Sequence, residues 1–368
     1  MFSEKISKIS LWDNLKNSGK PVVLYGMGDG ADKILDCCDR KNIEISGVFA
    51  SDAYVRGNYF RGFKIKKLSE IEEEYKDFCI LTAFATRDAG VIKKIYELNK
   101  KYELYSPNFP VFGNGEEYPD YDFFIRNICE AEKAYELLSG DLSRAVYLNS
   151  INFMITGKLK YLENIETPKE SGLDLLDLRD NLYYIDAGAY NGDTIFELKD
   201  YLDTKKINIT KIAAFEPDKK NFEKLVKNIP GKLDCELKLY NAGVWNEEKI
   251  LYFNAKSGRN ASLNNIDLKN KTEIKVNALD NIINITDEEN RSLLIKYDVE
   301  GSEFEALEGS RNIIEKYSPG LIVSLYHRNE DIFKLMLLIN DINPGYKFYM
   351  RKHRYIPCWD LNLYARQL

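Results

Sequence analysis

The residues best suited to chemistry are carboxylates that follow apolar runs in the second half of the sequence. Asp186 and Asp193 frame the glycine-containing run 187–192, Glu216 closes the next apolar run, and Asp298 closes a later one. In an open α/β sheet, such strand ends meet at the carboxyl edge, where ligands bind. The spacing therefore predicts a nucleoside-binding crevice at that edge.

The charge of the glycine loop indicates which nucleoside it binds. A dinucleotide would place its pyrophosphate at the helix N-terminus that follows the loop. Asp186 and Asp193 would then face like charge, which is unfavourable at short range. A ligand with an ammonium and a sulfonium group suits two carboxylates better, and S-adenosylmethionine (SAM) is such a ligand.

Two more residues fit this interpretation. Gly188 would let the backbone approach a ligand closely, and Glu216 can accept hydrogen bonds from both ribose hydroxyls. The alternative is that Asp186 and Asp193 only cap backbone groups, with Thr194–Glu197 as a capping box.

A second acidic cluster follows the apolar run that ends at Asp298. Asp298 could act as a general base, orient a substrate hydroxyl, or hold a divalent cation with Glu300. The alternative for both is a solvated strand end. Ser302 with Glu305 fits a capping box and Glu303 fits the helix dipole, so helix structure alone explains these three.

The sequence contains only two histidines. His327 ends the apolar run 321–326 at the same predicted edge as Asp298 and can titrate near neutral pH, so it is a second catalytic candidate. The alternative is a structural histidine. His353 belongs to the basic segment 350–354, which we interpret as a solvated turn rather than a contact to an anionic substrate.

Composition limits the class of protein. The chain has 368 residues, 44% hydrophobic and 30% charged, which suits two globular domains. A net charge of −6 gives no reason to expect nucleic acid as a partner. Six scattered cysteines, no signal peptide and no membrane span indicate a cytoplasmic protein with reduced thiols.

Strands alternate with helices in both halves, which predicts two mostly parallel sheets. We expect a Rossmann-like accessory domain at 1–112, a helical connector at 113–180 with helical spacing over 121–154, and a second α/β domain at 181–368. The first domain should have strands at 21–25, 43–49, 78–84 and 102–105. The second should have strands at 182–186, 211–215, 236–240, 249–253, 273–276, 293–298, 320–326, 346–350 and 361–365, and helices at 193–202, 218–228, 302–316 and 329–340.

The first domain carries a weaker motif. Gly26–Ala31 fits G-x-G-x-x-[GA] between a strand and a helix, and Asp52 follows the second strand, as in dinucleotide-binding sites. Asp29 inside the loop disfavours phosphate. We expect a domain without nucleotide that positions substrate or a partner; the alternative is an NAD(P)-dependent enzyme acting on a sugar nucleotide.

The ordered motifs of the second half resemble FkbM-type SAM-dependent methyltransferases. The resemblance runs from Asn181 to about Leu368. It rests on Ile185–Asp193, Ala214–Asp218 with Asn221-Phe222, Asn241–Val244, Val276–Asp280, Ile295–Glu303 and Leu363–Ala365.

The resemblance implies a class I methyltransferase fold, a mostly parallel seven-stranded sheet with its last strand antiparallel. It implies that Asp298 faces the reacting methyl and that Glu216 holds the ribose. It further implies that Asp186, Gly188, Asn191 and Asp193, with Gly192 in the same loop, surround the methionine end, and that Asn241 and Ala242 lie near the adenine.

One position departs from the family pattern. Tyr190 stands where the family often has Asn, and we expect it to cover the cofactor or narrow the substrate mouth. Family members commonly methylate hydroxyls of sugars or polyketide-type products. The resemblance thus implies an O-methyltransferase acting on a sugar, glycoconjugate precursor or related small molecule; a non-catalytic SAM-binding scaffold and a homodimer stay open.

Overall fold

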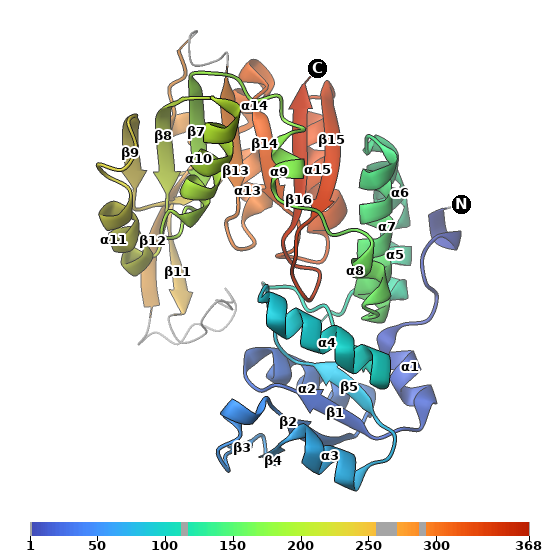
Figure 1. Cartoon of the computed structure of the whole chain (residues 1–368). Coiled ribbons are helices and arrows are strands. Elements are labelled where there is room, and N and C mark those ends of the chain that lie inside the picture. Colours follow the sequence, from blue (N-terminus) through green and yellow to red (C-terminus); the bar gives the residue numbers. More distant parts are fainter. Residues whose placement is uncertain (1, 112–116, 255–270, 287–291, 368) are drawn as a thin grey trace.

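Two β-sheets organise the chain, with a group of helices between them in sequence (Figure 1). We describe a computed structural model of the protein over residues 2–111, 117–254, 271–286 and 292–367. The mostly parallel arrangement of both sheets confirms the predicted α/β class.

The first sheet has the strand order β3-β4-β2-β1-β5-β6, parallel except for the β3–β4 hairpin. Its strands are β1 Val22–Tyr25, β2 Ile45–Phe49, β3 Tyr59–Phe60, β4 Phe63–Lys66, β5 Cys79–Thr82 and β6 Glu103–Tyr105; its helices are η1 Phe2–Glu4, α1 Leu11–Ser18, α2 Asp29–Lys41, η2 Asp52–Tyr54, α3 Leu68–Glu74 and α4 Ala89–Lys101. The four predicted strands are present. The β3–β4 hairpin was not predicted, because its short strands are largely exposed and lack an apolar run.

The segment 121–154, whose spacing predicted helical structure, is helical but divided into separate helices. The segment forms α5 Tyr121–Arg126, α6 Ile128–Leu137 and α7 Asp141–Thr156, followed by α8 Lys160–Glu163 and α9 Glu170–Leu173. Gly140, with φ of 80°, interrupts the helix before α7. Helix α7 lies along β15 and α6 packs on α15, so these helices cover the second sheet. The division into three segments at 112/113 and 180/181 therefore stays a prediction.

The second sheet has the order β15-β16-β14-β13-β7-β8-β9. Its strands are β7 Leu182–Ala187, β8 Ile209–Phe215, β9 Glu236–Tyr240, β13 Leu293–Tyr297, β14 Gly320–Ser324, β15 Tyr346–Lys352 and β16 Leu361–Gln367; its helices are α10 Asp193–Lys205, α11 Lys219–Asn228, α12 Leu279–Ile282, α13 Glu303–Glu308, α14 Arg311–Tyr317 and α15 Asp331–Ile342. β16, the last strand, runs antiparallel to both neighbours. This is the class I methyltransferase topology.

Three predicted elements, two strands and one helix, differ from the simple pattern of strands and helices around one sheet. The strands at 249–253 and 273–276 belong to a separate sheet of β10 Gly243–Val244, β12 Lys271–Asn277 and β11 Lys249–Asn254. The helix expected over 302–316 breaks between α13 and α14 at Gly309. A Cβ there would stand 1.9 Å from the carbonyl oxygen of Trp245, so the close approach of this loop requires glycine.

The turn between β15 and β16 joins the two sheets. Thr86, just after β5, exchanges two backbone hydrogen bonds of 2.7 and 2.9 Å with Ile356. The Cys358 amide donates to Asn108 Oδ1 at 3.0 Å. β15 runs parallel to β14, so this turn lies at the carboxyl edge of the second sheet. The carboxyl edges of the two sheets therefore contact each other.

The solvated turn expected at 350–354 is wrong for most of its residues. Arg351, Lys352 and His353 are buried. His353 Nε2 forms a 2.8 Å hydrogen bond with the Tyr364 hydroxyl. His353 Nδ1 lies 2.9 Å from the Thr167 carbonyl oxygen. His353 is a structural residue.

Within the described residues, no helix combines the length and apolar character needed to cross a membrane.

Candidate functional site

The glycine loop after β7 packs directly on the end of β13. Gly188 has φ of 94°, and a Cβ there would lie 1.9 Å from the carbonyl oxygen of Asp298. The glycine is thus required by the neighbouring strand, whereas the sequence suggested approach of a ligand. The loop and Asp298 are held in fixed relation.

The two loop aspartates have different surroundings. Asp186 is fully buried, and its Oδ2 accepts a 2.7 Å hydrogen bond from the Thr194 hydroxyl. Asp193 begins α10, accepts from the Thr194 amide at 2.9 Å, and donates its own amide to Asn191 Oδ1 at 3.1 Å. The helix cap is Gly192 without a side-chain bond, so the capping box at Thr194–Glu197 does not form.

Glu216 is buried at the end of β8 and faces the same loop. Its carboxylate accepts from the amides of Tyr190 at 2.9 Å and Asp218 at 2.8 Å. Burial raises the pKa of Glu216 to about 7, against the opposing effect of these amides. Asn241 donates to the Glu216 carbonyl at 2.9 Å, and Ala242 follows it between β9 and β10. Tyr190 is half exposed.

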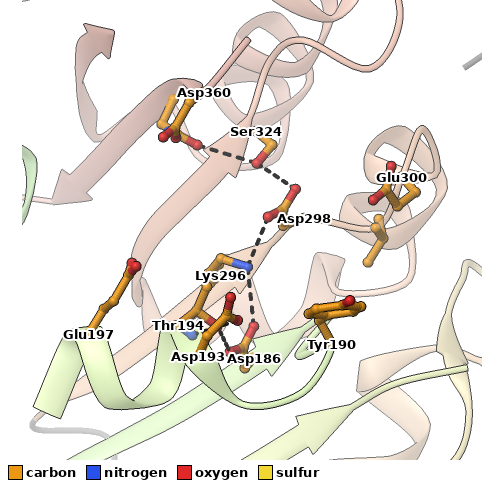
Figure 2. Close-up of polar contacts among 12 residues, drawn as sticks. Asp186, Tyr190, Asp193, Thr194, Glu197, Lys296, Asp298, Glu300, Ser324 and Asp360 are labelled. Atoms are coloured by element: carbon orange, nitrogen blue, oxygen red, sulfur yellow. Dashed lines mark hydrogen bonds and ion pairs between the residues drawn. The ribbon is translucent and has the colours of Figure 1, made fainter. Parts of the chain in front are cut away.

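A largely buried lysine, missed by the sequence interpretation, connects the two acidic clusters (Figure 2). Lys296 Nζ lies 3.4 Å from Asp186 Oδ1 and 3.2 Å from Asp298 Oδ2. Burial lowers the pKa of Lys296, but the two carboxylates outweigh it and keep the ammonium charged. A lysine inside the apolar run 293–297 was the available signal.

Asp298 is surrounded by donors. Its Oδ1 accepts from the hydroxyls of Ser324 at 3.0 Å and Tyr326 at 3.2 Å. Burial raises the pKa of Asp298, but the charges of Lys296 and His327 and the Ser324 hydrogen bond hold it well below its usual value. Asp298 is therefore ionised in neutral solution.

His327 is 1% exposed and lies among three carboxylates. Its Nδ1 is 2.9 Å from Glu303 Oε1, and its Nε2 is 3.5 Å from Glu300 Oε2 and 3.6 Å from Asp298 Oδ1. Burial lowers the pKa of His327, but Glu303 and then the other carboxylates raise it to about 10. The imidazole is thus a cation at neutral pH, which conflicts with its use there as a proton acceptor.

Glu303 was wrongly assigned to the helix dipole alone. It is buried, and besides His327 it accepts from the amides of Val299 at 2.8 Å and Gly301 at 3.0 Å. Ser302 is the cap residue of α13 but makes no side-chain capping bond, so the expected capping box is absent. Glu303 instead supports the loop between Asp298 and α13.

The donor set does not fit a divalent cation held by Asp298 and Glu300. One atom each of Asp298, Glu303 and His327 lies within 4.8 Å of the others, a spacing that a metal could use. However, Asp298 Oδ1 already accepts two hydroxyls, and Oδ2 pairs with Lys296. Lys296 and His327 supply the positive charge that a metal would bring.

The corresponding loop of the first sheet lacks this arrangement. Gly26 has φ of 109°, and a Cβ there would lie 2.6 Å from the ring of Phe84. The Tyr25 and Ser51 hydroxyls share a 2.9 Å hydrogen bond. Asp52 is exposed on η2, away from the position of a ribose-binding carboxylate at a strand end.

The second half of the chain has the class I methyltransferase fold. More particularly, residues 186–355 match the family model described as the Methyltransferase FkbM domain, which confirms the resemblance of this half to FkbM-type enzymes. No curated protein is significantly similar to the sequence.

One solved structure of a methyltransferase aligns with almost the whole chain. Methyltransferase FkbM from Methylobacillus flagellatus aligns with a TM-score of 0.71 and 21% identity, over 99% of this chain and 92% of that chain. The arrangement of both sheets therefore recurs there. An rRNA methylase from Streptococcus thermophilus (TM-score 0.32, 14% identity, 54% of this chain, 93% of that chain) and precorrin-6y C5,15-methyltransferase from Geobacter metallireducens (0.33, 14%, 56% and 91%) match more weakly.

Proposed function

We propose that the protein transfers the methyl group of SAM to a hydroxyl of a sugar, a glycoconjugate precursor or a related small molecule. One observation carries this proposal: at a single sheet edge, the Asp186 carboxylate of the glycine loop and the Asp298 carboxylate share Lys296. A donor bound by that loop and an acceptor at Asp298 would be adjacent.

The donor side follows from charge and hydrogen bonding. We infer that Asp186 and Asp193 attract the positive methionine end, with Gly188, Asn191 and Gly192 shaping the loop around it. Glu216 would accept the ribose hydroxyls through lone pairs that its two backbone amides leave free. Asn241 and Ala242, after β9, would lie beside the adenine, and Tyr190 would cover the cofactor.

On the acceptor side, the hydroxyl oxygen attacks the methyl carbon as the carbon–sulfur bond breaks, and the electron pair stays on sulfur. Alignment of the two groups is the main requirement. The hydroxyl proton becomes strongly acidic as the new carbon–oxygen bond forms. Asp298, although a weak base, can therefore accept it late in the reaction. His327, as a buried cation, would keep Asp298 ionised until that point. The Asp298 side chain is 27% exposed, so it would then release the proton to water.

The alternatives differ in ligand. An NAD(P)-dependent enzyme would bind its nucleotide at Gly26–Ala31, and a scaffold would bind SAM without turnover. The free state of all six cysteines fits the proposed cytoplasmic location.

Calorimetry with S-adenosylhomocysteine (SAH), SAM, NADH and NADPH tests the donor. We expect binding of SAM and SAH only; binding of NADH without SAH would contradict the proposal. Methyl transfer from labelled SAM to a panel of free sugars, nucleotide sugars and glycan acceptors then tests the acceptor class. Tight SAM binding with no transfer to any member would favour the scaffold.

A further inference from the structure

We propose that Lys296 is a positioning residue that couples the donor side of the site to the acceptor side and sets the relative affinity for SAM and SAH. A single buried ammonium is shared between Asp186 and Asp298. This inference rests on the proposed function, because it assumes that the donor binds beside Asp186.

The strand register places these three groups together. Lys296 of β13 is the direct partner of Asp186 of β7 across the parallel strands. Asp298 follows Lys296 by two residues, so it leaves the backbone on the same side. Since Asp298 also donates its amide to the Ala187 carbonyl at 2.9 Å, the ends of the two strands are tied beside the three charges.

The carboxylates of Asp186 and Asp298 have the same pattern of contacts. One oxygen of Asp186 accepts from Thr194 and the other faces Lys296. One oxygen of Asp298 accepts from Ser324 and the other faces Lys296. Lys296 side chain is only 12% exposed, so water screens these pairs little. Removing the ammonium would leave two like charges near each other without compensation.

A cationic ligand beside Asp186 must compete with this ammonium. SAM carries one more positive charge than SAH, because its sulfur is a sulfonium and the sulfur of SAH is neutral. Lys296 therefore disfavours SAM relative to SAH. The same field favours the transition state, in which the positive charge on sulfur is being lost, over bound SAM.

Calorimetric dissociation constants of SAM and SAH test this without knowledge of the acceptor. In Lys296→Met we expect the ratio of SAM affinity to SAH affinity to rise about tenfold or more. Asp186→Asn, which is nearly isosteric, should move the ratio in the opposite direction. Lys296→Arg should stay close to the parent, because the charge is kept.

Lys211→Met is the matched control. Lys211 is also a buried strand lysine, but its ammonium lies over the Tyr183 ring at 4.6 Å, at the far end of the strands from the site. In Lys211→Met, the ratio of SAM affinity to SAH affinity should equal that of the parent. Circular dichroism and thermal melting confirm that each variant is folded, and Lys296→Gln replaces Lys296→Met if the latter does not fold.

An unchanged ratio in folded Lys296→Met or Lys296→Gln, or in Asp186→Asn, overturns the coupling by Lys296. If the parent binds neither SAM nor SAH, the proposed function itself fails, which is a different outcome. A fall in affinity for both ligands by the same factor would assign Lys296 a structural role only.

Discussion

The loops at the carboxyl edges of the two sheets both contain a glycine with positive φ, but different groups pack against that glycine. Gly26 after β1 and Gly188 after β7 both have positive φ and leave room for a close neighbour. At the first sheet that neighbour is the ring of Phe84. At the second it is the backbone of Asp298, beside the buried carboxylate of Asp186.

The difference shows what distinguishes a candidate active site from a common architecture. A glycine loop between a strand and a helix is a property of the fold, and both sheets have it. Only at the second edge do the described residues bring together buried carboxylates with a lysine and a histidine. Burial of charge is unfavourable unless it is paired, so this cluster is better evidence of function than the glycine pattern.

The largest effect should come from Asp298. We expect Asp298→Asn to lower turnover about 10²- to 10⁴-fold, because the acceptor proton loses its base, with SAH affinity little changed. Asp52→Asn, at the exposed carboxylate of the first sheet, is the control and should leave turnover unchanged. Equal turnover in the Asp298 variant and the parent would show that Asp298 takes no part in the reaction. The two sheet edges would then not differ in function as we expect.

Glu216 should control donor affinity. Glu216→Gln is expected to weaken SAH binding by about 1.5–3 kcal/mol, through loss of charged hydrogen bonds to the ribose. Because its pKa is raised to about 7, SAH affinity of the parent should fall as the pH is lowered from 8 to 6, and the variant should lack this slope. Ser51→Ala, after β2 of the first sheet, should bind SAH like the parent in calorimetry.

The raised pKa of Glu216 also predicts how stability depends on pH, and here the trend is opposite to that of SAH affinity. A carboxyl whose pKa is higher in the folded state than its ordinary 4.5 stabilises the fold fully below about pH 4.5, and this contribution is lost as the pH rises through about 7. Above pH 7, Glu216→Gln should therefore be at least as stable as the parent in urea unfolding. A clearly less stable variant at pH 8 would contradict the burial penalty.

Substitution of a glycine should destabilise the protein more in the loop of the second sheet than in the loop of the first. Gly188→Ala combines backbone strain with a clash against Asp298, and we expect a loss of about 3 kcal/mol or more. Gly28→Ala has strain but no neighbour within 4 Å, and should lose about 1–3 kcal/mol. Urea unfolding measures both. A costlier Gly28→Ala would show that the first loop is the more constrained.

The smallest expected effect is that of dinucleotides on the first sheet. SAH at about 100 times its Kd should stabilise the protein by about 2.7 kcal/mol and raise its Tm. NADH and NADPH at the same concentration should not move the Tm, since Asp52 is exposed and Phe84 lies against the loop. A Tm increase with NADPH that Gly28→Ala abolishes would restore a nucleotide site there.

Apolar runs and glycine loops predicted most of the sheets. The seven main strands of the second half were found from runs such as 182–186, and the order of motifs predicted the fold. Helix breaks were missed where the cause is tertiary, as at Gly309, which must admit the Trp245 carbonyl. The sequence indicated Asp298 and His327 but not that Lys296 and Glu303 face them, because such contacts depend on strand register.

The position of β16 between β14 and β15 has a consequence for biosynthesis. The ribosome makes β16 after both of its neighbours, so β14 and β15 wait with unpaired edges until residues 361–367 emerge. Asn362 of β16 then accepts a 3.3 Å hydrogen bond from Ser324, which contacts Asp298. The emerging protein therefore completes the surroundings of Asp298 only after both neighbours of β16 have been made, and until then these strand edges are exposed to pairing with other nascent chains.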